Sequence, residues 1–118
     1  IPIEYALEKG NDKIVVVLTR NPGYRKKRAL KATEQLYKRA YKKYPNLVHA
    51  IMTRNAVYNR QMKLIEKLEE EGKIFVIRPL IPTVSRMEKD YDKLQHFYMH
   101  GNRLMKKEYQ GLLEYLNE

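Results

Sequence analysis

Short apolar runs and longer apolar stripes alternate along the chain, and this alternation predicts strands separated by helices. Five consecutive apolar residues, mostly β-branched, occupy 14–18, and the turn residues Asn21-Pro22-Gly23 follow closely. Such a run predicts a strand buried on both faces, as in a parallel sheet covered by helices. A second apolar run at 74–77 predicts another buried strand. The long helical segment between the two runs is what a parallel crossover requires.

Four helices are predicted around these strands, over residues 2–10, 29–43, 46–71 and 90–117. Gly10 ends the first helix, while Pro45 separates the second from the third and leaves Asn46 as a cap. Ser85 and Glu88 fit a capping box ahead of the fourth helix. We therefore predict a helix-rich α/β fold, with helices packed on a short, mostly parallel sheet. No linker or domain boundary is visible, so residues 1–118 are expected to form a single unit.

Several tyrosines fall on the apolar stripes of the predicted helices. Tyr37, Tyr41, Tyr44 and Tyr58 are spaced so that each lies on the same side of its helix as the aliphatic residues. This placement predicts that they belong to the core. It also argues against their use as stacking platforms for nucleic-acid bases.

The net charge of +10, from 24 Lys and Arg against 14 Asp and Glu, favours contact with polyanions. Nucleic acid, anionic lipid head groups and acidic substrates all meet this description. The alternative is a solvated surface, or one that pairs with an acidic portion of a larger protein. The longest apolar run is far below the ~20 residues of a membrane-spanning helix. The absence of cysteine excludes disulfides and thiolate metal sites.

A dense basic cluster follows the first predicted strand. The candidate anion- or substrate-binding residues are Arg20, Tyr24, Arg25, Lys26, Lys27 and, after the second strand, Arg78. If the strands are parallel, Arg20 and Arg78 emerge at the same sheet edge, where α/β proteins usually bind ligands. Arginine forks suit phosphate, and Tyr24 can stack or hydrogen-bond. The alternative interpretation is a solvated turn that leads into a basic helix.

Common catalytic motifs are absent. The chain has no G-x-S-x-G, Walker, G-x-G-x-x-G or H-E-x-x-H motif, and its only serine is Ser85. His96 and His100 have metal-ligand spacing but no nearby carboxylate, so we interpret them as a surface pair and expect no metal or other cofactor.

A polar group interrupts the apolar face of the third predicted helix. It consists of Arg54, Asn55 and Asn59. We favour a boundary position, or buried hydrogen bonding of these residues to a neighbouring loop, over a role as the wall of a polar cleft.

Two stretches resemble bacterial patatin-like phospholipases. The first is Ile-Pro-Ile-Glu-Tyr-Ala-Leu-Glu-Lys-Gly at 1–10, followed by Asp-Lys-Ile-Val-Val-Val-Leu-Thr-Arg-Asn-Pro-Gly-Tyr-Arg-Lys-Lys at 12–27. The second is Phe-Val-Ile-Arg-Pro at 75–79 with Val-Ser-Arg-Met-Glu-Lys-Asp at 84–90. The order and spacing of these stretches, rather than any single motif, carry the resemblance. It covers essentially the whole chain and corresponds to the family's carboxyl-terminal part.

The resemblance implies a serine acyl hydrolase with a three-layer α/β fold and a Ser–Asp dyad. In that family the Ser lies in a G-x-S-x-G turn, and the Asp lies in an Asp-Gly motif a few residues before a Pro-x-x-x-Ala stretch. Residues 2–6 match that last stretch, so the dyad and the oxyanion loop are expected upstream of Ile1. The chain alone is then expected to be inactive, and no residue here takes a catalytic role. A divergent relative that has lost the dyad and kept a scaffold role is a further alternative.

On this interpretation the parent protein acts on a lipid or ester through its preceding portion. The basic rim is expected to meet an anionic membrane surface, with nucleic acid a minor partner, and the protein is expected to be cytoplasmic or peripheral to the inner membrane face. An exposed sheet edge would make the isolated chain self-associate. The competing hypothesis is a stand-alone basic module that binds anionic membrane or nucleic acid.

Overall fold

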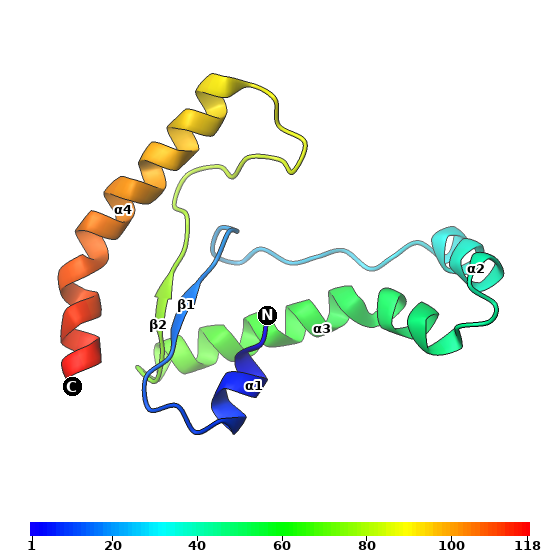
Figure 1. Cartoon of the computed structure of the whole chain (residues 1–118), viewed down its shortest axis with the longest axis horizontal. Helices are drawn as coiled ribbons and strands as arrows, with labels where there is room; N and C mark the ends of the chain where they lie inside the picture. Colours follow the sequence, from blue (N-terminus) through cyan, green and yellow to red (C-terminus); the bar gives the residue numbers. More distant parts are fainter.

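Two parallel strands form a small sheet with helices on both of its faces (Figure 1). The computed structural model describes every residue from 1 to 118. The elements in chain order are α1 (Ile3–Glu8), β1 (Val15–Val17), α2 (Lys31–Ala40), α3 (Pro45–Glu70), β2 (Phe75–Ile77) and α4 (Tyr91–Asn117). The predicted helix-rich α/β fold with a short parallel sheet is confirmed.

The register of the sheet pairs Val15 with Phe75, Val16 with Val76 and Val17 with Ile77. Flanking backbone bonds extend the pairing, since the Leu18 N–H donates to the Ile77 carbonyl at 2.8 Å. Helices α2 and α3 make the crossover between the strands. The chain turns from α3 into β2 at Gly72, whose φ of 68° lies in the left-handed region that favours glycine.

The main core lies between one face of the sheet, α1 and α3. It consists of Ile3, Val16, Leu18, Met62, Ile65, Leu68 and Ile74. Met62 and Ile65 are almost completely buried because they project from the middle of α3 against both α1 and the sheet. This packing fixes α3 against β1 and so places the start of the basic loop.

The opposite face of the sheet packs against α4, which lies over β2. The rings of Phe75 and Tyr115 are 5.8 Å apart, and Gly111 leaves room for the Phe75 ring. The Tyr115 hydroxyl accepts a hydrogen bond from the Ile14 N–H at 3.0 Å and lies 3.1 Å from the Lys73 carbonyl, to which it can donate. One side chain of α4 therefore ties together the segments that enter both strands.

Helix α4 does not cover β1 in the same way. Val15 is 39% exposed and Val17 is 71% exposed, whereas Val16 on the α3 side is buried. The prediction that this strand is buried on both faces is therefore wrong for this chain. Because α4 is seated on β2 and no third strand flanks β1, one face and the outer edge of β1 remain open.

Several predicted helix ends and caps differ from the structure. Helix α2 ends at Ala40 instead of 43, in a turn. Pro45 is the first residue of α3, and Asn46 does not cap it. Ser85 accepts a bond from the Met87 N–H within a separate turn, whereas Asp90 caps α4 by accepting from the N–H groups of its second and third residues. The carboxylate of Asp90 displaces Ser85 as cap because it stands directly before the first helical turn.

The tyrosine prediction is correct only in part. Tyr58 is half-buried beside the core, and Tyr37 is partly buried. Tyr41 and Tyr44 are exposed, and the exposed fraction of Tyr44 is 62%. The reason is that α2 packs only on α3 at the far end of the molecule, so there is no second layer to bury its apolar side.

Candidate anion-binding site

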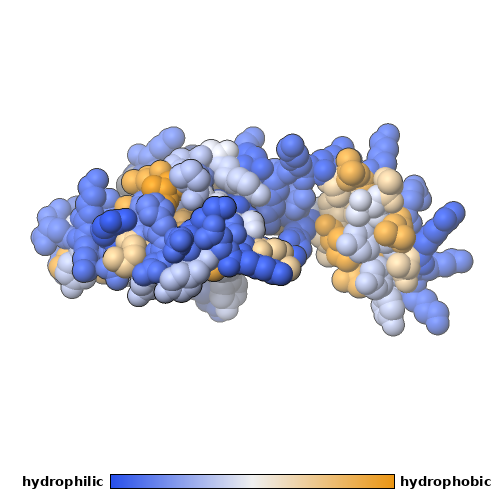
Figure 2. Space-filling model, turned by 90° about the horizontal axis from the view of Figure 1, so that it is seen from above, coloured by the Kyte–Doolittle hydropathy of each residue, from blue (hydrophilic) through white to orange (hydrophobic).

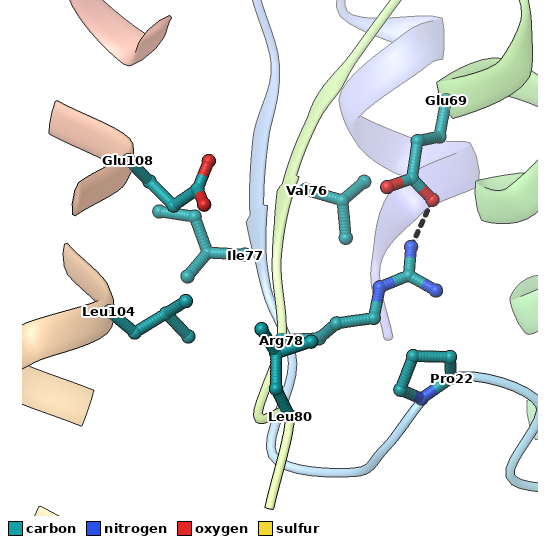
Figure 3. A pocket seen from close by; sticks show the side chains of 8 residues that line it. All are labelled: Pro22, Glu69, Val76, Ile77, Arg78, Leu80, Leu104 and Glu108. Atoms are coloured by element: carbon teal, nitrogen blue, oxygen red, sulfur yellow. Dashed lines mark hydrogen bonds and ion pairs between the residues drawn. The ribbon is translucent and has the colours of Figure 1, made fainter. Parts of the chain in front are cut away.

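Arg20 and Arg78 follow the carboxyl ends of β1 and β2, which are parallel, so they emerge at the same edge of the sheet as predicted. Their guanidinium groups then take different partners. Arg20 donates to the Thr83 hydroxyl at 3.2 Å and lies 4.9 Å from the centre of the Tyr24 ring. Arg78 points to α3 and forms an ion pair with Glu69 (Figure 3). With its side chain only 11% exposed, Arg78 is a structural cation rather than a free ligand group.

Arg25 is also paired with α3. Its two terminal nitrogens donate to the two carboxylate oxygens of Glu66, one of them at 3.0 Å. The hydrogen bond raises the pKa of Arg25 and lowers that of Glu66, and the charge of Arg78 lowers the Glu66 pKa further. Glu66 and Glu69, one turn apart on α3, therefore neutralise two of the predicted anion-binding arginines.

Two asparagines of α3 hold the basic loop by its backbone. Asn59 accepts from the Lys26 N–H at 2.8 Å and donates to the Lys26 carbonyl at 2.9 Å. Asn55 donates to the Lys27 carbonyl at 2.7 Å. The favoured interpretation of these asparagines, hydrogen bonding to a neighbouring loop, is confirmed. Arg54, the third member of the polar group, is exposed.

An aromatic pair also joins the basic loop to α3. Tyr24 and Tyr58 meet edge to face with ring centres 6.2 Å apart, and the Lys26 ammonium lies 4.3 Å from the Tyr58 ring centre. Burial, followed by the neighbouring Tyr24, raises the pKa of Tyr58. Tyr24 therefore packs against Tyr58 and also makes a cation–π contact with the Arg20 guanidinium.

The cations that remain available lie on the outer side of the loop. Lys27 and Arg28 are exposed, and neither has a carboxylate partner. A hollow of about 320 Å³ opens beside them, and its polar lining is formed by Lys26, Arg28, Thr53, Asn55 and Asn59. Two cations next to amide and hydroxyl groups suit a phosphate or carboxylate. The structure thus divides the predicted cluster: Lys26 and Lys27 stay at an accessible surface, joined by Arg28, while Arg25 and Arg78 are neutralised internally.

Two hollows lie at the carboxyl ends of the strands, against α4. The first has a volume of about 300 Å³, and its apolar lining includes Leu18, Ile77, Phe97, Leu104 and Met105. The second, also about 300 Å³, is lined by Pro22, Leu80 and Leu104 together with the Arg78–Glu69 pair and Glu108 (Figure 3). The sequence pattern predicted neither hollow, because the apolar positions of the helix predicted over residues 90–117 indicate a side to be covered and not a cavity. The first hollow has the chemistry for a hydrocarbon chain, whereas the second has a mixed lining with three charged side chains.

Neither metal-binding geometry nor a membrane span is found. No group of three or more His, Cys, Asp or Glu side chains is placed to hold an ion. His100 accepts a hydrogen bond from the Leu80 N–H at 3.1 Å, which gives this residue a structural task. None of the helices combines the length and apolarity needed to cross a bilayer.

Comparisons with known proteins place part of the chain in a family. Neither the curated proteins nor the solved structures include a significant match. A family model described as a domain of unknown function, DUF6363, matches residues 44–117. The match spans α3, β2 and α4, and leaves out α1, β1 and the basic segment with α2. Because it covers more than half of the chain, this protein belongs to the DUF6363 family.

Proposed function

We propose that this chain is the carboxyl-terminal portion of a patatin-like lipid acyl hydrolase, which adds strands, covering helices and a basic surface to a larger α/β domain. The Ser–Asp dyad of such an enzyme would lie in the preceding portion. The chain itself would be inactive and would shape the lipid-facing side of the enzyme.

The observation that carries this proposal is the open side of β1. Parallel sheets occur almost only with both faces covered and with several strands. Here two strands stand alone, Val17 is 71% exposed, and an apolar hollow of about 230 Å³ borders β1. Its lining consists of Ile1, Pro2, Ile3, Ala6, Ile14, Val15, Val16 and Val17. A further strand or helix of the same domain would cover this side in the way the core covers Val16.

The dimensions of the molecule support the same interpretation. The surface of 9521 Å² compares with about 6,800 Å² for a compact chain of this mass. The radius of gyration of 17.8 Å compares with about 13.5 Å for a compact domain of this length. Surface in such excess is typical of a partner in a larger packed unit.

The apolar hollow at the carboxyl ends of the strands adds chemical support. Ligands of α/β proteins bind at this edge, and the lining of Phe97, Leu104 and Met105 suits an acyl chain. Together with the basic surface elsewhere on the chain, this hollow favours a phospholipid-like substrate. The same surface supports a cytoplasmic protein that is peripheral to the inner membrane face.

The test is the coding sequence ahead of Ile1 together with activity of the full protein. The proposal expects a G-x-S-x-G motif and an Asp-Gly pair shortly before Ile1. It also expects ester cleavage that is lost when that Ser is changed to Ala. A reading frame that starts directly before Ile1, with neither motif, would refute the proposal.

The second candidate is a stand-alone basic module that binds anionic membrane or nucleic acid. The observation in its favour is the concentration of positive charge between residues 20 and 43, which hold ten Lys and Arg and one acidic residue. A module of this kind would be monodisperse when isolated, and its polyanion affinity would fall steeply with salt. An enzyme portion with an open sheet edge would instead self-associate.

A further inference from the structure

Almost all the net charge of the protein lies in one segment. Outside residues 20–43 the chain has fourteen Lys and Arg against thirteen Asp and Glu, whereas inside there are ten against Glu34 alone. Within the segment, Arg25 is paired with Glu66 and Lys38 with Glu34, and the other eight cations have no carboxylate partner. The cations around Glu34 lower its pKa, with the hydrogen bond from Lys38 as the main cause.

The segment projects from the body of the protein. Helix α2 stands at one end of the molecule, is joined to the sheet by an extended stretch, and packs only on α3 (Figure 1). None of its residues is buried. Charge and apolar surface are therefore presented at the same protruding end.

The two sides of α2 differ in chemistry. At 3.6 residues per turn, one side carries Lys31, Gln35, Lys38 and Arg39, and the other carries Leu30, Thr33, Leu36, Tyr37 and Ala40. Part of the apolar side meets α3, but Leu30 remains 74% exposed and Leu36 remains 66% exposed. Two further apolar residues are exposed at the start of α3: Tyr44 is 62% exposed and Leu47 is 45% exposed. Figure 2 shows apolar surface at this end with hydrophilic side chains projecting outward beside it.

We propose that α2, with Leu30, Tyr44 and Leu47, is an interfacial element that docks this protein on an anionic lipid bilayer. Leucine and tyrosine side chains enter the head-group boundary, while the lysines and arginines flank it and contact phosphate and carboxylate head groups. The inference deepens the proposed function, because it names the surface that would bring a lipid hydrolase to its substrate.

The positive charge of this segment complements an anionic bilayer, and the exposed leucines favour a bilayer over nucleic acid. Phosphate backbones are bound by cations and by aromatic stacking, for which leucines on the same element have no use. A membrane boundary accepts both, since the aliphatic stems of lysine lie along the apolar layer while their ammonium groups stay in water. The inference also moves the membrane contact away from Arg20 and Arg25, which are held by Thr83 and Glu66.

The test measures partition of the chain onto phosphatidylcholine vesicles with and without phosphatidylserine. One variant combines Leu30→Ser and Leu36→Ser, and a second combines Lys31→Gln, Lys42→Gln and Lys43→Gln. The matched controls are Met87→Ser, at a position 73% exposed, and the combination of Lys89→Gln, Lys106→Gln and Lys107→Gln at exposed positions. We expect each α2 variant to weaken partition onto phosphatidylserine vesicles by on the order of tenfold to a hundredfold. The controls should bind as the unaltered chain does.

A second measurement reports insertion directly, because the chain has no tryptophan. Leu36→Trp should give a fluorescence blue shift on phosphatidylserine vesicles and quenching by brominated acyl chains, whereas Met87→Trp should give neither. An emission already blue-shifted in the full protein without vesicles would overturn the proposal, since the apolar side would then be covered by protein. Equal partition of the α2 variants and the controls would also overturn it.

Two further outcomes have separate meanings. Binding to a single-stranded oligonucleotide but not to vesicles, lost in the lysine variant and kept in the leucine variant, would assign the surface to nucleic acid and overturn the inference. Failure of the full protein to cleave a soluble short-chain ester would refute the hydrolase proposal. Vesicle partition would be unaffected by that result, so the two failures are distinguishable.

Discussion

Arg25 and Glu66 face each other across the basic loop and α3, with both terminal nitrogens of the arginine donating to both carboxylate oxygens. Their side chains are 31% and 28% exposed, so water screens the pair only in part. This contact, with the Arg78–Glu69 pair one helical turn further on, turns two predicted ligand groups into fixed elements of the structure.

We expect Glu66→Gln to lower the free energy of unfolding by about 1 kcal/mol, because a bidentate but partly exposed ion pair is lost. Glu69→Gln should cost more, about 1–3 kcal/mol, since it leaves the nearly buried Arg78 without its partner. Urea unfolding measures both changes. Glu70→Gln, at an exposed position of the same helix without an ion pair, is the control and should change little. Equal effects of all three variants would contradict the assignment.

The same pair predicts a pH dependence. Arg25 lowers the pKa of Glu66 in the folded protein. The contribution of the ion pair to the free energy of unfolding is therefore complete above the unfolded carboxyl pKa of about 4.3, and it is lost as the pH falls through the lower pKa of the folded state. The stability difference between the unaltered chain and Glu66→Gln should therefore be constant near neutral pH and shrink below about pH 4.3. Thermal unfolding at a series of pH values measures it. A difference that grows on acidification would have the wrong sign.

Asn59 should control the mobility of the basic loop, because it bonds both backbone groups of Lys26. In Asn59→Ala the Lys26 amide loses its acceptor, and we expect its hydrogen exchange to accelerate by roughly fivefold, for a bond of about 1 kcal/mol. Amide exchange followed by mass spectrometry or NMR tests this. Asn102→Ala, exposed on α4, should leave that amide unchanged. If exchange at Lys26 stays the same in both variants, the asparagine does not hold the loop.

Tyr115→Phe removes only the hydroxyl that joins the segments entering β1 and β2. The Ile14 N–H then loses an acceptor at 3.0 Å, and we expect a loss of about 1–2 kcal/mol in the free energy of unfolding. Tyr109→Phe, on the same helix and 54% exposed, is the matched control and should be close to neutral. Chemical denaturation compares them, and equal stability of the two variants would contradict the role of Tyr115.

The open side of β1 predicts self-association of the isolated chain. Val17→Lys places a charge at the most exposed valine of the strand and should reduce association at high protein concentration. Sedimentation velocity measures the change. Leu80→Lys, 61% exposed and outside the strands, is the control. If the unaltered chain is already monomeric at high concentration, the self-association expected for a portion of an enzyme does not occur.

Local pattern was sufficient for the elements but not for the candidate site. The runs at 14–18 and 74–77 and the apolar stripes predicted both strands and all four helices, since side-chain periodicity reports backbone geometry directly. The basic cluster was found as a list of residues, yet its pairing with Glu66 and Glu69 was not. Those carboxylates lie about forty residues from Arg25 and nine residues from Arg78 in sequence, and nothing in local spacing links them.

The sequence by itself determined the helix and strand elements, and with them the α/β class, and the concentration of charge in residues 20–43, because these depend on local periodicity and on composition. Only the tertiary structure decided which surfaces are free. It placed α4 over β2 and left Val17 open, and it set α2 beyond the reach of the core so that Leu30 and Leu36 remained exposed. The physical reason is that burial depends on which other elements arrive at a surface, and an apolar stripe specifies a side to be covered without specifying what covers it.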